Sequence, residues 1–201
     1  MFESGQISAL AIMVLTIVFS LLGMKSMPKI IDRCLFRPYY FLRKQQYDTI
    51  VLSGFIHADL AHLLFNMFTF YFFAFPMERH IGTIPFLILY LVGLVSSHAC
   101  TYFKHKDNIA YASLGASGAI SAVLFAYIVF FPTTMLMIIP IPIPIPAALF
   151  AVGYVAYSYW ASKQSRGRIN HDAHLCGALS GLAFVGVTDP GAFIRVLSAL
   201  A

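Results

Sequence analysis

Long apolar runs separated by short polar stretches dominate this chain. Six runs can be distinguished, at 7–24, 60–77, 84–103, 114–131, 147–161 and 173–188. A helix needs about 20 predominantly apolar residues to cross a bilayer, so several of the six are short for a full span. Short helices remain compatible with a membrane if neighbours bury them or if they enter it only part way. The pattern predicts an all-α membrane protein, a compact bundle of six transmembrane helices.

Two connections between these runs have distinctive sequences. The loop at 25–46 mixes basic with aromatic residues, which predicts a segment lying on lipid headgroups. After the fourth run, Pro140, Pro142, Pro144 and Pro146 alternate with isoleucine. Proline lacks a backbone donor and has a fixed φ, so we expect an extended, stiff linker here. The fifth run ends in aromatic residues typical of a membrane interface, Tyr154, Tyr157, Tyr159 and Trp160.

The composition agrees with a membrane protein. Apolar residues make up 60% and charged residues 10% of the 201 positions, against about 45–50% and about 25% in soluble domains. We expect one membrane-embedded domain, 1–201, with its core at 47–188 after a first transmembrane helix and a loop. The formal charge of +5 is concentrated in the loops, which indicates contact with the lipid bilayer and not with a nucleic acid.

Cysteine and histidine do not suggest a metal or cofactor. The three cysteines are odd in number and far apart, so they predict no disulfide framework and no CxxC redox or zinc motif. Membrane zinc proteases carry HExxH, whereas His57 and His62 have a different spacing and no intervening glutamate. We therefore expect no metal and no cofactor.

Polar residues inside apolar runs are costly in a membrane and are usually functional. His62 and Asn66 lie four positions apart at the start of the second run, so they share one helix face. Both can donate hydrogen bonds into the bundle, either as interhelical contacts or as part of a site. His57 and Asp59 lie nearer the helix start, where Asp59 can cap the N-terminus.

A serine stands among small residues where the fourth run begins, in Gly115-Ala-Ser117-Gly118. A helix N-terminus favours a developing negative charge, and glycine lets another backbone approach closely. The motif alone is weak, because small residues are common where membrane helices touch. It differs from the GxSxG of soluble hydrolases, since alanine follows Gly118.

The sixth run carries a histidine on a face of small residues. His174, Gly177 and Gly181 are spaced i, i+3, i+7 and share one face, and Ala173 extends the small-residue stripe. Such stripes allow close packing of membrane helices. The imidazole of His174 is therefore expected at a tight contact with a neighbouring helix.

Taken together and in this order, these clusters resemble the rhomboid family of intramembrane proteases. The matching motifs are His62-x-x-x-Asn66, Gly115-x-Ser117-Gly118, His174-x-x-Gly177-x-x-x-Gly181 and, after the second run, Glu78-x-x-x-Gly82. The resemblance covers about 47–188, and the helix number agrees with the basic bacterial form of the family. It implies a multi-pass protein of a bacterial inner or plasma membrane.

The resemblance also implies an activity and a site. The chain would be a serine endopeptidase that cleaves transmembrane protein substrates in or near their helices. Ser117 would be the nucleophile and His174 its general base, without a third acidic residue. The backbone N–H of Ser117, His62 and Asn66 would stabilise the oxyanion. Substrates would enter sideways, near the second and fifth helices.

Two features depart from this expectation. Some family members carry an aromatic residue four positions after the serine, stacked on the histidine, where this chain has Ser121. The positive-inside rule also conflicts with the family. All cationic residues except Arg79 and Arg195 fall in loops on the side of Ser117, which directs that side to the cytoplasm, whereas the family implies the outer face.

Two other functions fit parts of the pattern. One is a proteolytically silent rhomboid-like protein that binds membrane helices, against which the presence of both Ser117 and His174 counts. The other is a small transporter or channel, which would normally show acidic residues within its helices or internal repeats.

Overall fold

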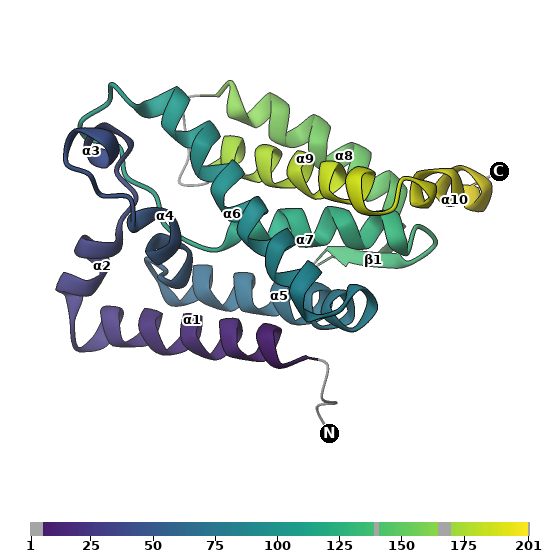
Figure 1. Ribbon diagram of the computed structural model, residues 1–201, viewed down its shortest axis with the longest axis horizontal. Helices are drawn as coiled ribbons and strands as arrows, with labels where there is room; N and C mark the ends of the chain where they lie inside the picture. Colours follow the sequence, from purple (N-terminus) through teal and green to yellow (C-terminus); the bar gives the residue numbers. More distant parts are fainter. Residues whose placement is uncertain (1–5, 139–140, 165–169, 201) are drawn as a thin grey trace.

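The protein folds into a bundle of helices that run back and forth along one direction (Figure 1). The computed structural model describes residues 6–138, 141–164 and 170–200. The long helices are α1 (Ile7–Lys25), α5 (Leu60–Ile81), α6 (Thr83–His105), α7 (Ser117–Phe130), α8 (Ala147–Ser162) and α9 (His171–Thr188). Shorter elements are α2 (Pro28–Cys34), α3 (Pro38–Arg43), α4 (Thr49–Leu52), the 3-10 turn Ser53–Phe55 and α10 (Gly191–Leu200).

Each of the six apolar runs forms one of the long helices. Within the described ranges, three helices (α1, α5 and α6) are long and apolar enough to cross a membrane. The pair α9 and α10 is bent by 109° and would count as a fourth span. The apolar α7 is shorter, with 14 residues. The expected helical membrane architecture is confirmed, while six crossings are not established by helix length.

The two connections differ in how well the sequence predicted them. The loop at 25–46 was expected to lie on lipid headgroups, with no helix assigned to it, and it contains α2 and α3, each of which begins with a proline. Proline suits the first helical position because no N–H is needed there. The isoleucine–proline stretch is extended, as predicted, and forms β2 (Ile141–Pro146).

An antiparallel partner for β2 is supplied by β1 (Met135–Ile138). Leu136 pairs with Ile145 and Met137 with Pro144. Because proline has no N–H, the free edge of β2 has few donors with which another strand could pair. Pro140, named in the sequence analysis, lies outside the described ranges, as do Arg166 and Arg168, two of the cationic residues counted there.

The centre of the bundle is α7, which packs against α5, α6, α8 and α9. Almost its entire length is buried, from Gly118 to Val129. Figure 1 shows that α5, α7 and α9 all start at the end of the bundle where α2 and α3 lie. The hairpin and α10 occupy the opposite end. The polar motifs, which are far apart in sequence, therefore begin at one end of the molecule.

A fully buried carboxylate holds α1 against α5. Glu78 accepts hydrogen bonds from the backbone N–H groups of Ser8 (3.1 Å) and Ala9 (2.7 Å) and from Thr83 Oγ1 (2.9 Å). The first N–H groups of a helix have no partner within the helix, and a negative charge is favourable there. The Glu78-x-x-x-Gly82 motif thus supplies a cap from one helix to another, and Gly82 ends α5 with φ of 84°.

Candidate functional site

Ser117 is the first residue of α7, and the chain turns sharply just before it. Gly115 has φ of +108°, a conformation that L side chains rarely adopt, and its N–H donates to the Ser53 carbonyl at 2.8 Å. A Cβ at Gly115 would lie 2.9 Å from Cε1 of His62. Glycine is therefore required here both by the backbone conformation and by the imidazole packed against it.

His62 and Asn66 lie on the first turns of α5 and face the start of α7. Asp59 caps α5, because its carboxylate accepts from the His62 N–H at 2.8 Å, as the sequence predicted. The ring of His62 meets that of buried His57 edge to face, with 4.8 Å between centroids. Asn66 is buried one turn further on, and its Nδ2 donates to the His62 carbonyl at 3.0 Å.

His174 lies on the second turn of α9, whose small residues face α7. A Cβ at Gly177 would overlap the carbonyl oxygen of Gly118, and one at Gly181 would overlap that of Ala122. The two helix backbones are therefore in direct contact. This contact begins at Gly118, the residue after Ser117, so α9 carries its histidine to the start of α7.

The sequence interpretation missed one member of this constellation, Tyr154 on α8. We expected it in an interfacial aromatic belt, and Tyr157, Tyr159 and Trp160 are indeed exposed. Tyr154 instead points inward, with its hydroxyl 2.7 Å from Ser121 Oγ. Its ring lies 6.4 Å from that of His174, at an interplanar angle of 22°.

A helical-face analysis of α8 would have identified Tyr154. The residue falls on the same face as Ala147 and Ser158, seven positions after the first and four before the second, and both are buried. When only the number of aromatic residues near the helix end is considered, Tyr154 is grouped with its exposed neighbours. The 3.6-residue period of the helix places Tyr154 on a different face from those neighbours.

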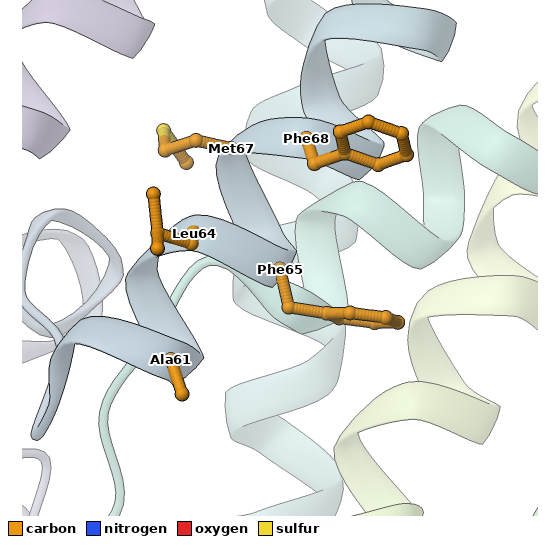
Figure 2. Close-up of a pocket in the computed structure, with 5 residues that line it drawn as sticks. All are labelled: Ala61, Leu64, Phe65, Met67 and Phe68. Carbon is orange, nitrogen blue, oxygen red and sulfur yellow. The ribbon is translucent and has the colours of Figure 1, made fainter. Parts of the chain in front are cut away.

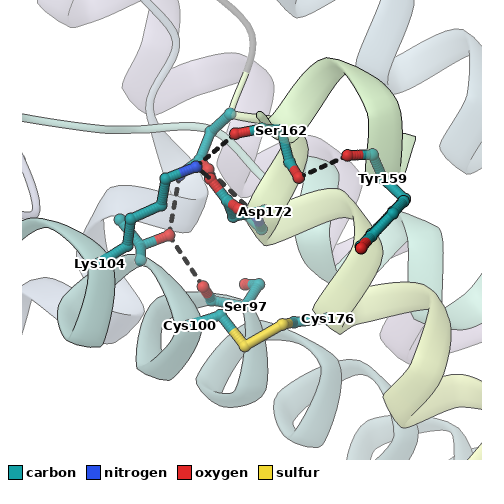
Figure 3. Close-up of polar contacts among 10 residues, drawn as sticks. Ser97, Cys100, Lys104, Tyr159, Ser162, Asp172 and Cys176 are labelled. Carbon is teal, nitrogen blue, oxygen red and sulfur yellow. Dashed lines mark hydrogen bonds and ion pairs between the residues drawn. A yellow bond between two sulfur atoms is a disulfide. The ribbon is translucent and has the colours of Figure 1, made fainter. Parts of the chain in front are cut away.

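Three tethers to α6 hold the first turns of α9 on either side of His174. Asn170 Nδ2 donates to Thr101 Oγ1 at 2.8 Å. Lys104 Nζ donates to Asp172 at 2.6 Å and also to the Ser162 carbonyl of α8 at 2.6 Å (Figure 3). The third tether is a disulfide between α6 and α9.

This disulfide joins Cys100 to Cys176 and corrects the expectation that the cysteines form no bridge. The two residues are separated by 76 positions in sequence, and their Cα atoms are 6.4 Å apart. They meet because α6 packs along α9, which cysteine spacing cannot reveal. Figure 3 shows the bridge beside the Lys104–Asp172 contact. Cys34 remains a free thiol.

A small polar cavity of about 20 Å³ lies behind Ser117. Its lining includes Ser117, Gly118, Thr101, Asn170 and Ala173, from α6, α7 and the start of α9. A cavity of this size and polarity can hold one water molecule. No group of three or more His, Cys, Asp or Glu side chains suited to a metal occurs in the part of the chain that the structure describes.

The predicted site residues thus gather at one end of the bundle, although not all are in contact. Gly115 brings Ser117 close to His62, and the Gly118–Gly177 contact brings α7 close to α9. Ser117 and His174 share no direct hydrogen bond among the described residues. They are linked through Ser121 and Tyr154: Ser121 Oγ donates to the Ser117 carbonyl at 2.9 Å.

Comparison with known proteins gives one family. Residues 44–188 match the family model described as Rhomboid domain. The chain is 34% identical over 139 residues, 68% of its length, to the zebrafish (Danio rerio) presenilin-associated rhomboid-like protein A, mitochondrial. It is 28% identical over 145 residues, 65% of its length, to the Arabidopsis thaliana RHOMBOID-like protein 12, mitochondrial.

A shorter match involves a bacterial protein. Over 73 residues the chain is 34% identical to YdcA of Bacillus subtilis (strain 168), whose name refers to a rhomboid protease. The chain spans between 36% and 43% of the length of these three relatives. Because two of the three are named as mitochondrial, the relatives do not single out a bacterial membrane.

Proposed function

The chain belongs to the rhomboid family, and we propose that it is an intramembrane serine protease in which Ser117 and His174 form a catalytic dyad. The observation that carries this proposal is the convergence of three distant segments. Ser117 starts α7 two residues after Gly115, against which the imidazole of His62 packs, and the α9 helix that bears His174 touches the α7 backbone at Gly118. We infer that α7, α8 and the bent α9–α10 pair complete six crossings of an integral membrane protein.

The proposed reaction proceeds in two steps. Ser117 Oγ attacks the scissile carbonyl of a substrate helix, and its proton passes to His174. His174 then gives that proton to the leaving amine, which leaves an acyl group on Ser117. In the second step, water gives a proton to His174 and its oxygen bonds the acyl carbon; the bond from that carbon to Ser117 Oγ then breaks, and His174 returns the proton to Ser117 Oγ as the new carboxyl end of the substrate leaves. The polar cavity behind Ser117 is a reservoir for that water.

The oxyanion would be stabilised by the start of α7 and by α5. No side chain caps the N-terminus of α7, so the N–H of Ser117 is free to donate to a ligand. The helix dipole also favours negative charge there. His62 packs against Gly115, and Asn66 has a second Nδ2 hydrogen besides the one given to the His62 carbonyl. Such preorganised donors account for a large part of many rate enhancements.

An apolar groove on α5 provides a surface for a substrate helix. It measures about 520 Å³ and is lined by Ala61, Leu64, Phe65, Met67 and Phe68 (Figure 2). Figure 2 shows the two phenylalanines on one side of α5 and Leu64 and Met67 on the other. Because the groove begins at the turn that carries His62, a helix lying in it would have its end near Ser117.

Labelling with a fluorophosphonate probe tests the proposal. These probes react only with an activated serine, so the purified protein is expected to become labelled and Ser117→Ala to remain unlabelled. Ser198→Ala, at an exposed serine of α10 whose hydroxyl bonds the Ile194 carbonyl, serves as the control and is expected to be labelled like the wild type. If the purified wild type cleaves no transmembrane reporter and takes up no probe, the chain is instead a silent rhomboid-like protein that binds membrane helices.

The disulfide bears on the orientation in the membrane. Disulfides persist in oxidising compartments, and Cys100–Cys176 lies toward the end of the bundle that holds Ser117. We infer that this end faces the bacterial exterior or the equivalent oxidising side of an organelle. The basic loops then lie against headgroups on that side. There Arg43 covers the Tyr39 ring at 4.2 Å and Lys44 the Tyr40 ring at 4.4 Å.

Cysteine labelling measures this orientation. Ala110 is exposed in the loop before α7, and Thr133 is exposed at the opposite end. In intact bacterial cells, a membrane-impermeant maleimide is expected to label Ala110→Cys and to label Thr133→Cys only after permeabilisation. Cys34→Ser in both variants removes the free thiol. The reverse labelling pattern would restore the orientation that the positive charges favour.

A further inference from the structure

The ring of Tyr154 is placed to control the orientation of His174. The two rings are nearly parallel, at 22°, with centroids 6.4 Å apart. Aromatic pairs in this range attract one another, and a flat neighbour limits rotation of the imidazole.

Hydrogen bonds connect Tyr154 to the backbone of the proposed nucleophile. Ser121 Oγ donates to the carbonyl oxygen of Ser117 at 2.9 Å. The Ser121 hydroxyl has a single hydrogen, so the 2.7 Å contact between Ser121 and Tyr154 must be donated by the tyrosine hydroxyl. Tyr154 therefore lies against His174 with its ring, and its hydroxyl bonds Ser121, whose own hydroxyl bonds the Ser117 carbonyl.

The helix that carries Tyr154 is held by packing and by polar contacts at two levels. α8 packs on α9 and, less extensively, on α7, and the Ser162 carbonyl at its end accepts a hydrogen bond from Lys104 Nζ. Much of its remaining surface is apolar and exposed, including Leu149 at 63% and Val152 at 68%. An added Cβ at Gly153 would meet no atom within 4 Å. Tyr154 is thus an inward polar contact in the middle of α8, and its place depends on how α8 packs.

We propose that Tyr154 is a positioning residue that aligns His174 with Ser117 and makes this alignment depend on how α8 is seated. The inference rests on the proposed function of Ser117 and His174. In a proton transfer between serine and histidine, the imidazole nitrogen must point at the hydroxyl. When α8 is seated, the Tyr154 ring restrains His174. When α8 moves outward, the imidazole loses that restraint.

The test is the division of an activity loss between kcat and KM. Tyr154→Leu retains a shorter apolar side chain but lacks the ring. We expect kcat for a transmembrane reporter in liposomes to fall about 10- to 100-fold with KM nearly unchanged, the size of effect that follows from a misplaced catalytic group. Tyr154→Phe keeps the ring and is expected to remain within about 5-fold of the wild-type kcat, since only the hydrogen bond is lost.

Phe150→Leu is the matched control. Phe150 lies one turn earlier on α8 and packs against the same apolar cluster; its ring meets that of Tyr154 at 5.8 Å but not that of His174, so the variant tests the packing around Tyr154 without removing the Tyr154 ring. Its kcat is expected to stay within about 3-fold of the wild type, as for a loss of packing that leaves the catalytic geometry intact. Thermal unfolding in detergent verifies that all three variants are folded.

Each outcome has a clear meaning. A wild-type kcat in folded Tyr154→Leu would overturn the inference. An equal loss in Tyr154→Phe would assign the effect to the hydroxyl and overturn the role of the ring. An equal loss in Phe150→Leu would assign it to general packing of α8 and overturn the inference too. Failure of the proposed function is distinguishable, because the wild type itself would then neither cleave the reporter nor take up a fluorophosphonate.

Discussion

Reporter cleavage is expected to fall by at least about 10³-fold in Ser117→Ala, in His174→Ala and in the double variant, with little difference among the three. When two residues act together in one chemical step, removing either one already abolishes most of the rate enhancement that the pair provides, so removing both adds little. The residual rate would come from the oxyanion donors and from substrate binding alone. Steady-state kinetics with a single-pass reporter in liposomes measures all three variants.

His171→Ala is the control for the histidine. His171 lies at the first turn of α9, with its ring 6.1 Å from that of His174 and 5.4 Å edge-to-face from that of Tyr157. This variant is expected to retain most of the wild-type activity. A double Ser117→Ala, His174→Ala variant far below both single variants would contradict a dyad, because independent contributions add in free energy.

Gly177→Ala is expected to have the second-largest effect, on stability and activity together. The new methyl group would overlap the carbonyl oxygen of Gly118, and a backbone atom cannot move aside as a side chain can. Overpacking of this kind costs about 1–3 kcal/mol or more. The α9 helix would have to move away from α7 and take His174 with it. A displacement of about 1 Å at a catalytic group can cost about 10²-fold in rate.

Gly186→Ala provides the comparison within the same helix. A Cβ at Gly186 would meet only a ring carbon of Phe193 at 3.8 Å, an ordinary van der Waals contact. Alanine also favours a helix over glycine by up to about 1 kcal/mol. This variant is expected to be as stable as the wild type or slightly more so. Thermal unfolding measures the stability of both variants, and reporter kinetics measure their activity. Wild-type values for Gly177→Ala would show that the α7–α9 contact does not position His174.

The loops and short elements illustrate where sequence reasoning was insufficient. The sequence analysis assigned no helix to the loop at 25–46, yet Pro28 and Pro38 each start a short helix there, α2 or α3, because proline is acceptable in a first turn. The isoleucine–proline stretch was correctly predicted as extended. Its pairing with β1 was not, since strand pairing depends on a partner elsewhere in the chain.

For the site, too, the sequence named the residues, whereas their contacts became known only from the structure. The family motifs named Ser117, His174, His62 and Asn66 from their polar character within apolar runs, and their catalytic roles stay predictions. The sequence did not show which side chain packs against His174, because the position four residues after the serine, where some family members have an aromatic residue, is Ser121. In the structure, Ser121 binds the hydroxyl of Tyr154, and the aromatic ring comes from α8.

The sequence by itself determined where the helices lie and which face of α9 is small enough to touch another backbone. It could do so because bilayer length and the 3.6-residue period act on neighbouring residues. Only the tertiary structure decided that Cys100 meets Cys176, that His62 fills the space beside Gly115 and that Tyr154 stacks on the histidine. These contacts join different segments of the chain, and the relative placement of those segments is set by packing of the whole bundle. Ser117 is recognisable as one residue in a motif, whereas its surroundings are assembled from four helices.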